Sequence, residues 1–196
     1  MYRVKVYTLE REQWIPVSLD RAFDFFGDAA NLERITPPWL GFRILSPLPV
    51  EMRTGARIEY RIWLGGVPAR WATRITRWDP PRAFVDLQES GPYALWEHLH
   101  EFAPLGAGVL MRDRVRYALP FGYLGRAVHR SLIRSLLARI FDYRFAVIRE
   151  RFGGAGDPES GSRSAADSGR APDLRSTGAN RSSTVPRRAP RRHREQ

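Results

Sequence analysis

The most informative chemical feature of the sequence is a pair of histidines two positions apart, His98 and His100, in a segment that alternates like a strand. Because successive side chains of a strand point to opposite faces, both imidazoles share a face with Trp96 and Phe102. The other face carries Glu97, Leu99 and Glu101. The aromatic neighbours indicate that the histidine face is the inner one.

A carboxylate is expected opposite these histidines. The next strand, residues 109–119, follows a tight turn at residues 106–107, and counting outwards from this turn pairs His100 with Asp113. A slip of one residue would turn three arginines inward, at a prohibitive cost in free energy. These arginines are Arg112, Arg114 and Arg116. The register therefore predicts a His–Asp pair on the inner face.

A second carboxylate comes from the preceding strand, residues 83–89. Asp86 and Gln88 share a face with Phe84, and a turn at residues 91–92 would bring Asp86 near His98. The predicted semi-polar cluster, set in an aromatic wall, consists of Asp86, Gln88, His98, His100 and Asp113.

Several interpretations of this cluster compete. Buried polar groups are normally paired, so the cluster suits a satisfied internal network. Convergent polar groups in an apolar pocket also orient a ligand's hydroxyl or carbonyl. A His–Asp pair further suits acid–base catalysis, with His98, His100 and Asp113 as the catalytic candidates. A His-x-His pair with a carboxylate binds divalent ions as well, but His–Asp ion pairing would compete, so we expect no metal and no cofactor.

The elements that position the cluster are read from periodicity. We expect a strand over residues 2–15, two short helices over 19–26 and 29–35, and strands over 42–46, 57–64, 69–78, 83–89, 95–102 and 109–119. From residue 122 to 152 apolar side chains recur every three or four positions, which predicts one long helix. Its arginines, Arg144 among them, fall mostly off this apolar face.

This order predicts an α+β fold. A curved antiparallel sheet of about seven strands buries one face against the long C-terminal helix, and a cavity between sheet and helix is the natural ligand site. We expect His129, on the helix, to be a surface residue.

Composition bounds the function. The chain has 196 residues, a net charge of +11 and no cysteine, which excludes disulfides, thiolate metal sites and a cysteine nucleophile. Its basic residues are nearly all arginine, which weakens an inference of nucleic-acid binding from charge alone, so no specific nucleic-acid partner is expected. We see no signal peptide and no membrane-spanning apolar run, and expect a cytoplasmic protein.

The composition changes after Phe152. Residues 153–196 are rich in Ser, Gly, Pro, Ala and Arg and contain no aromatic residue, so we expect a folded domain over 1–152 and a disordered basic tail over 153–196. The tail holds 9 arginines and 5 acidic residues. Either it is a solvated segment without a partner, or it makes a weak electrostatic contact with an anionic membrane or, without sequence specificity, with nucleic acid.

The sequence resembles the START/Bet v 1-like (SRPBCC) helix-grip superfamily, and within it an uncharacterised bacterial subgroup similar to cyclases and dehydratases. The resemblance covers about residues 3–152. It is carried by residues 31–42, 78–86, 88–93 and 140–144, together with Trp96, His98, His100 and Phe102. It implies a helix-grip fold around a ligand cavity, and the superfamily contains carriers, sensors and enzymes.

We therefore expect binding or transport of a hydrophobic small molecule, such as a lipid, a quinone or a polyketide-like compound. The alternative is a cyclase or dehydratase that uses a His–Asp acid–base pair. A second alternative is docking to anionic membranes through the arginine-rich helix and tail. The expected ligand-binding residues are Trp39, Tyr60, Trp71, Phe84, Asp86, Gln88, Tyr93, Trp96, His98, His100, Met111 and Asp113.

Overall fold

A computed structural model describes residues 5–64, 66–120 and 132–153. All of them belong to one of the two units into which the chain divides, Met1–Pro158. The expected tail, the first part of the long helix and His129 lie outside the described residues.

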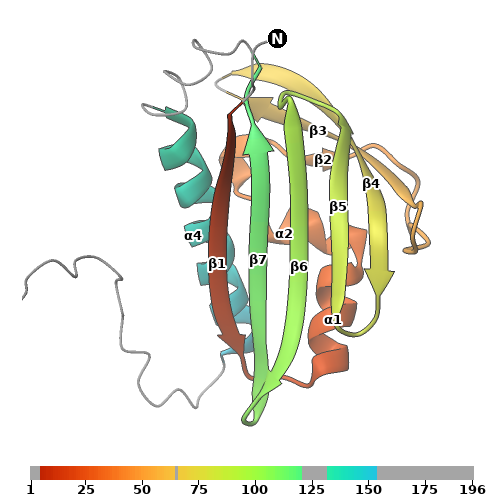
Figure 1. Ribbon diagram of the computed structural model, residues 1–196, viewed down its shortest axis with the longest axis vertical. Helices are drawn as coiled ribbons and strands as arrows, with labels where there is room; N and C mark the ends of the chain where they lie inside the picture. The colour runs from red at the N-terminus through yellow and green to blue at the C-terminus, as the bar shows by residue number, and fades with distance from the viewer. Residues whose placement is uncertain (1–4, 65, 121–131, 154–196) are drawn as a thin grey trace, which may run out of the picture. The chain divides into compact units, whose positions relative to one another are not determined.

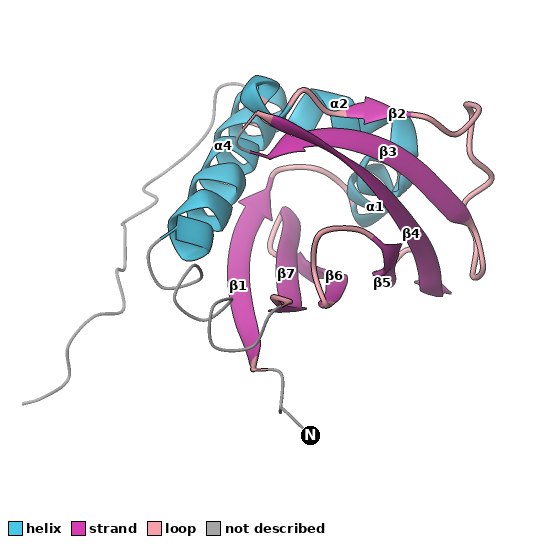
Figure 2. Cartoon of the chain, turned by 90° about the horizontal axis from the view of Figure 1, so that it is seen from above, coloured by secondary structure: helices cyan, strands magenta, loops and turns pink. Residues whose placement is uncertain are grey.

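Seven strands form one antiparallel sheet in the order β1-β7-β6-β5-β4-β3-β2 (Figure 1). Seen from above, the sheet is curved and the helices lie on its concave side (Figure 2). The α+β helix-grip prediction is confirmed. The strands are β1 (Val6–Ile15), β2 (Arg43–Ile44), β3 (Arg57–Leu64), β4 (Val67–Asp79), β5 (Ala83–Ser90), β6 (Leu95–Leu105) and β7 (Gly108–Ala118).

The helices are α1 (Leu19–Gly27), α2 (Leu32–Ile35) and α4 (Arg134–Phe152). Ser18 caps α1 by accepting a hydrogen bond from the Arg21 amide, as an N-cap serine does. The expected second helix is divided, because the 3₁₀ turn η1 (Ala29–Asn31) precedes α2. No helix among the described residues is long and apolar enough to cross a membrane.

The strand expected over residues 42–46 is only two residues long in the structure, where it is β2. The amides of Leu45 and Ser46 both donate to the carbonyl oxygen of Glu59, so the regular ladder ends there. The Ile44 amide donates to a Glu33 carboxylate oxygen instead of to a strand. A side chain of α2 therefore terminates this edge of the sheet.

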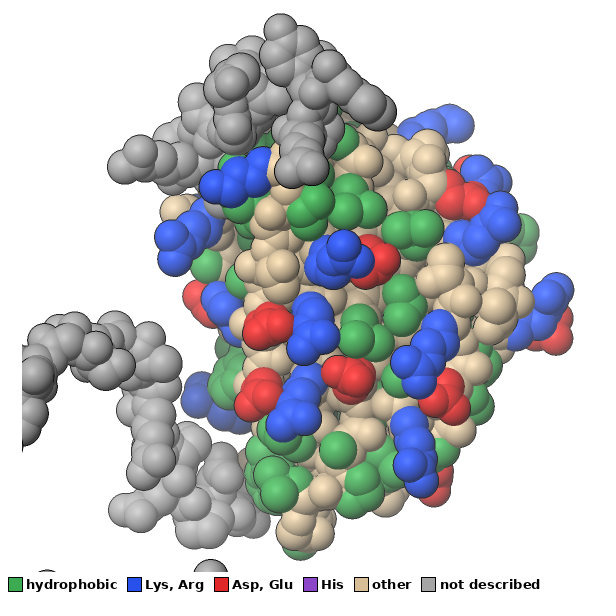
Figure 3. Space-filling model, viewed as in Figure 1, with side chains coloured by type: hydrophobic (Ala, Val, Ile, Leu, Met, Phe, Trp, Pro, Cys, Tyr) green, Lys and Arg blue, Asp and Glu red, His purple; other side chains and the backbone are tan. Residues whose placement is uncertain are grey.

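The β6–β7 register is the one expected from the sequence. His100 lies opposite Asp113 and His98 lies opposite Val115. The outward arginines of β7 pair with acidic side chains on the neighbouring strands, in the pairs Arg112–Glu12, Arg114–Glu10 and Arg116–Glu97. Basic and acidic side chains alternate over this outer face, and no histidine is visible on it (Figure 3). The charge pattern keeps the histidines on the concave side.

The buried apolar side chains form two clusters. One joins α1 to β5, β6, β7 and the end of α4, and includes Phe23, Phe84 and Phe102. The other joins β7 to the start of α4, and includes Val115 and Phe141. The histidines of β6 lie where the clusters meet, since His100 stacks on Phe84 and His98 contacts Phe141.

Candidate functional site

A cavity of about 160 Å³ lies between the concave face of the sheet and α4. Most of its wall is aliphatic or aromatic. Strands β3 to β6 contribute Ile58, Tyr60, Ile62, Leu64, Trp71, Thr73, Ile75, Phe84, Asp86, Trp96, His98 and His100. Helix α4 contributes Leu136, Leu137, Ile140, Phe141 and Arg144. A predominantly apolar pocket with a few inward polar groups is the usual form of a small-molecule site.

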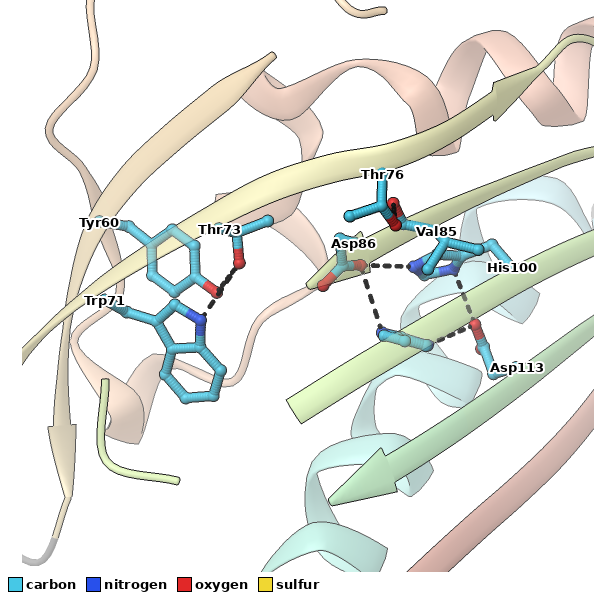
Figure 4. A network of polar contacts seen from close by, with 9 residues as sticks. Tyr60, Trp71, Thr73, Thr76, Val85, Asp86, His100 and Asp113 are labelled. Atoms are coloured by element: carbon cyan, nitrogen blue, oxygen red, sulfur yellow. Dashed lines mark hydrogen bonds and ion pairs between the residues drawn. The ribbon is translucent and has the colours of Figure 1, made fainter. Parts of the chain in front are cut away.

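The polar part of the wall is built by three adjacent strands. Asp86 lies opposite His98 in the β5–β6 register, and Asp113 lies opposite His100 in the β6–β7 register. The two aspartates thus flank the histidine strand from either side (Figure 4). All four side chains are at least four-fifths buried.

Each carboxylate contacts both imidazoles. Oδ1 of Asp113 lies 2.9 Å from Nε2 of His98 and 2.9 Å from Nδ1 of His100. Oδ2 of Asp86 lies 3.2 Å from Nε2 of His100 and 3.7 Å from Nδ1 of His98. Each imidazole therefore has one nitrogen near Asp86 and the other near Asp113, although Nδ1 of His100 makes no hydrogen bond within the described residues. We call these four side chains the His–Asp quartet.

Aromatic packing holds the rings in place. The centroids of the two imidazoles are 3.7 Å apart, and the ring of Phe84 stacks on His100 at 4.2 Å. On the far side, Phe141 of α4 meets His98 edge-on at 5.7 Å. Neither imidazole can rotate freely without displacing a packed ring.

The surroundings shift the pKa values of His98, His100 and Asp113 in different directions. Burial, with repulsion from His100, lowers the pKa of His98. Burial acts in the same direction on His100, but the Asp113 and Asp86 carboxylates outweigh it and raise the pKa of His100. Burial alone would raise the pKa of Asp113, but the two imidazoles hold it well below its ordinary value. The pKa values of the two neighbouring histidines are thus shifted in opposite directions.

A second polar group lies nearby on β3 and β4. The Tyr60 hydroxyl lies 3.4 Å from Oγ1 of Thr73, and Nε1 of Trp71 donates to that oxygen at 3.2 Å (Figure 4). Burial raises the pKa of Tyr60 well above its ordinary value, so this hydroxyl stays neutral. The cavity therefore has two polar regions, one ionisable and one neutral.

Eight of the expected ligand-binding residues line the cavity. They are Tyr60, Trp71, Phe84, Asp86, Tyr93, Trp96, His98 and His100. Asp113 instead lies behind the histidines and faces a smaller cavity of about 130 Å³ between β1 and α4.

The other three expected residues lie away from the main cavity wall. The Gln88 side chain bonds the backbone of Tyr93 at both its amide and its carbonyl. Met111 is fully enclosed in the core beside α1. Trp39 is 49% exposed and packs against Tyr143 of α4. Turn closure and core packing explain these positions without a ligand.

Arg144 and Thr73 are cavity residues that were not among the expected ligand contacts. Arg144 was assigned to the polar face of the helix, but it lines the cavity one turn beyond Ile140. Its Nε atom is buried and has no hydrogen-bond partner among the described residues. The i, i+4 spacing from Leu136 through Ile140 to Arg144 is the signal that would have found it.

Comparison with known proteins places this geometry in context. Residues 15–141 match the family described as polyketide cyclase / dehydrase and lipid transport. No curated protein matches the chain.

Solved structures share the fold at low sequence identity. TTHA0849 from Thermus thermophilus aligns with a TM-score of 0.61 at 18% identity, over 77% of this chain and 100% of that protein. The ZhuI aromatase/cyclase from Streptomyces sp. R1128 aligns with a TM-score of 0.59 at 16% identity, over 76% and 99%. A norcoclaurine synthase mutant from Thalictrum flavum aligns with a TM-score of 0.56 at 12% identity, over 77% and 99%.

Proposed function

Because this chain belongs to the polyketide cyclase / dehydrase and lipid transport family, we propose that it binds one hydrophobic small molecule between the sheet and α4. The observation that carries the proposal is the cavity, whose apolar wall is interrupted by only a few polar side chains. Lipids, quinones and polyketide-like aromatics share the apolar surface that such a wall recognises.

The volume limits the ligand. An engineered apolar cavity of about 150 Å³ accommodates benzene. A cavity of about 160 Å³ therefore suits a single-ring molecule or a short acyl chain. A polycyclic ligand would require side chains such as Trp71 or Trp96 to move.

The polar groups set the second requirement. Asp86, His98 and His100 form one polar patch of the wall, and Tyr60 with Thr73 forms another. A ligand that leaves these groups unpaired would pay their desolvation cost without compensation. The favoured ligand is therefore apolar over most of its surface and carries a hydroxyl or carbonyl oxygen.

Native mass spectrometry of the purified full chain, followed by solvent extraction, tests the proposal. We expect one small apolar molecule bound per chain, with an oxygen-bearing group. A chain that retains nothing, and whose melting temperature does not respond to a panel of lipids, quinones and aromatic ketones, would contradict it.

Acid–base catalysis on a ketone is the second candidate. It is favoured by a specific observation: two imidazoles, each in contact with two carboxylates, face the cavity directly. One group would remove an α-proton from carbon while another donates a proton to the carbonyl oxygen, which yields an enol. Reversal of this step in D₂O places deuterium on the α-carbon.

Deuterium incorporation into cyclohexanone, followed by NMR, measures that step with a ketone that matches the cavity volume. We expect the wild-type chain to accelerate exchange and His100→Ala to lose the acceleration. Glu97→Gln, on the outer face of β6, is the matched control and should keep it. Equal exchange rates for wild type and His100→Ala would exclude this role.

A further inference from the structure

We propose that Asp86, His98 and His100 bind a divalent transition-metal ion, and that Asp113 positions the two imidazoles for it. The sequence spacing alone led us to expect no metal. The arrangement of the four side chains in space carries the inference, which is independent of the identity of the apolar ligand.

The distances on the Asp86 side suit metal ligands. One ligand atom from each of Asp86, His98 and His100 lies within 4.8 Å of the others. Oδ2 of Asp86 lies 3.2 Å from Nε2 of His100 and 3.7 Å from Nδ1 of His98. Tetrahedral ligands at about 2.0–2.1 Å from zinc are about 3.3–3.4 Å apart. The 3.7 Å separation exceeds a hydrogen bond. Because the three atoms are spread over up to 4.8 Å, the side chains must draw together by as much as about 1.5 Å to share a metal.

The opposite side of the rings has the arrangement that metal-bound histidines require. A ligating histidine donates its other ring N–H to a carboxylate or a carbonyl, which fixes the tautomer. Oδ1 of Asp113 lies 2.9 Å from Nε2 of His98 and 2.9 Å from Nδ1 of His100. The His98 contact is a hydrogen bond, whereas Nδ1 of His100 lies close to the same oxygen without a hydrogen bond and needs a small rotation of the ring or the carboxylate to donate to it.

This tautomer has a consequence for Asp86. With the His98 N–H directed to Asp113, the lone pair of His98 Nδ1 faces the Asp86 carboxylate, and Nε2 of His100 lies within hydrogen-bond distance of the same carboxylate. Lone pairs and a carboxylate repel one another unless a proton or a cation lies between them. A metal ion at that point would replace the proton between His100 and Asp86 and bind all three groups as ligands.

The charge of the quartet supports the same conclusion. Side chains of Asp86 and Asp113 are 17% and 13% exposed. Within the described residues, both carboxylates have their ion pairs with the two imidazoles rather than with arginine. Two buried negative charges are costly unless compensated. A divalent ion with two neutral histidines balances both.

The site is open on one side. Asp86, His98 and His100 line the main cavity, whereas Asp113 does not. Three protein ligands leave at least one coordination position, as catalytic zinc sites do. That position faces the cavity, where a water molecule or an oxygen atom of a bound molecule completes the coordination. Two histidines and one carboxylate suit Zn²⁺ and other first-row ions.

Metal titration of the untagged full chain, stripped with a chelator, tests this inference. We expect calorimetry to show one Zn²⁺ per chain, and Co²⁺ to give the visible absorption of a low-coordinate nitrogen–oxygen site. Asp86→Asn and His98→Gln should weaken Zn²⁺ binding at least about 100-fold, and Asp113→Asn about 10- to 100-fold, as expected for a supporting carboxylate.

The other two histidines of the chain provide the matched control. The double variant His129→Ala/His193→Ala should still bind one Zn²⁺ with unchanged affinity. The inference is overturned if the wild type takes up no stoichiometric metal, and this titration needs no variant. It is also overturned if folded His98→Gln, checked by circular dichroism, binds Zn²⁺ as the wild type does, or if the double variant loses the ion.

Discussion

Oδ1 of Asp113 reaches Nε2 of His98 at 2.9 Å, although Asp113 lies opposite His100 and only diagonally across from His98. Diagonal neighbours on paired strands lie within reach of long side chains. One carboxylate on β7 therefore contacts two successive inward residues of β6. The same carboxylate that helps to stabilise the folded sheet therefore also orients the imidazoles that line the cavity.

The pair should be energetically coupled. His98→Ala leaves a buried carboxylate with one partner fewer and should lower the free energy of unfolding by about 3 kcal/mol. The double variant with Asp113→Asn should be more stable than the sum of the single effects implies, by about 1 kcal/mol or more. Urea unfolding of the four proteins measures this cycle. Strictly additive effects would show that the contact contributes nothing.

Acid should destabilise the protein through Asp113. Because the pKa of Asp113 in the folded state lies well below its ordinary value of 3.8, the unfolded state binds more protons as the pH falls. The stabilisation is complete above the unfolded pKa and is lost as the pH drops below about 3.8 toward the folded pKa. In metal-free protein, the free energy of unfolding of Asp113→Asn should therefore change less between neutral and acidic pH than that of the wild type. Parallel curves for the two proteins would refute this.

Trp39→Ala separates stability from binding. The indole packs on Tyr143 with centroids 5.4 Å apart, and Arg139 lies 5.5 Å from its ring centre. We expect a loss of about 1 kcal/mol in the free energy of unfolding, typical of an aromatic pair. Because Trp39 lies outside the cavity wall, affinity for a single-ring probe such as phenol should not change. A marked loss of phenol affinity would assign Trp39 to the ligand site.

Filling the cavity should abolish binding. Leu136→Trp adds bulk to the α4 side of the wall and should reduce phenol affinity at least about tenfold, equal to 1.4 kcal/mol. Leu132→Trp is the same substitution at a position that is 61% exposed, and it should leave the affinity unchanged. Calorimetry compares the two. Equal affinity in both variants would place the ligand elsewhere.

Membrane docking has a separate test. Four arginines of α4 are exposed, namely Arg134, Arg139, Arg149 and Arg151. If these arginines attract anionic lipid, the full chain should bind phosphatidylserine vesicles at low ionic strength and dissociate at high salt, because surface charges are screened. Arg139→Glu/Arg149→Glu should weaken the binding. Attachment that persists in high salt would not be electrostatic.

The sequence predicted the β6–β7 hairpin because two independent patterns agree there. The turn at Gly106 sets the pairing, and the alternation of arginines on β7 forbids a slip. Asp86 was expected near His98 because it shares a face with Phe84 and a turn at residues 91–92 returns the chain, and the β5–β6 register places the two residues opposite each other. Period-two alternation translates directly into faces of a sheet, so residues on those faces follow from the sequence.

The helix was predicted less well. Periodicity located its apolar side but assigned Arg144 to the polar one, whereas the structure directs Arg144 to the cavity. A residue at the edge between the apolar and the polar side of a helix points either to solvent or into the core. Which of the two it does depends on the angle at which the helix crosses the sheet. The crossing angle is set by the packing of the helix on the sheet, so it cannot be read from the residue pattern of the helix alone.

The alternation of side chains and the placement of charges along the strands were enough to predict the fold class, the inner face of the central strands and the pairing of His100 with Asp113, because both patterns are local and periodic. The contact of each carboxylate with both imidazoles, the place of Arg144 in the cavity wall and the absence of Met111 from that wall follow only from the folded structure. These features depend on side-chain rotamers and on the docking of α4 across a curved sheet, which arise from close packing among residues far apart in the chain.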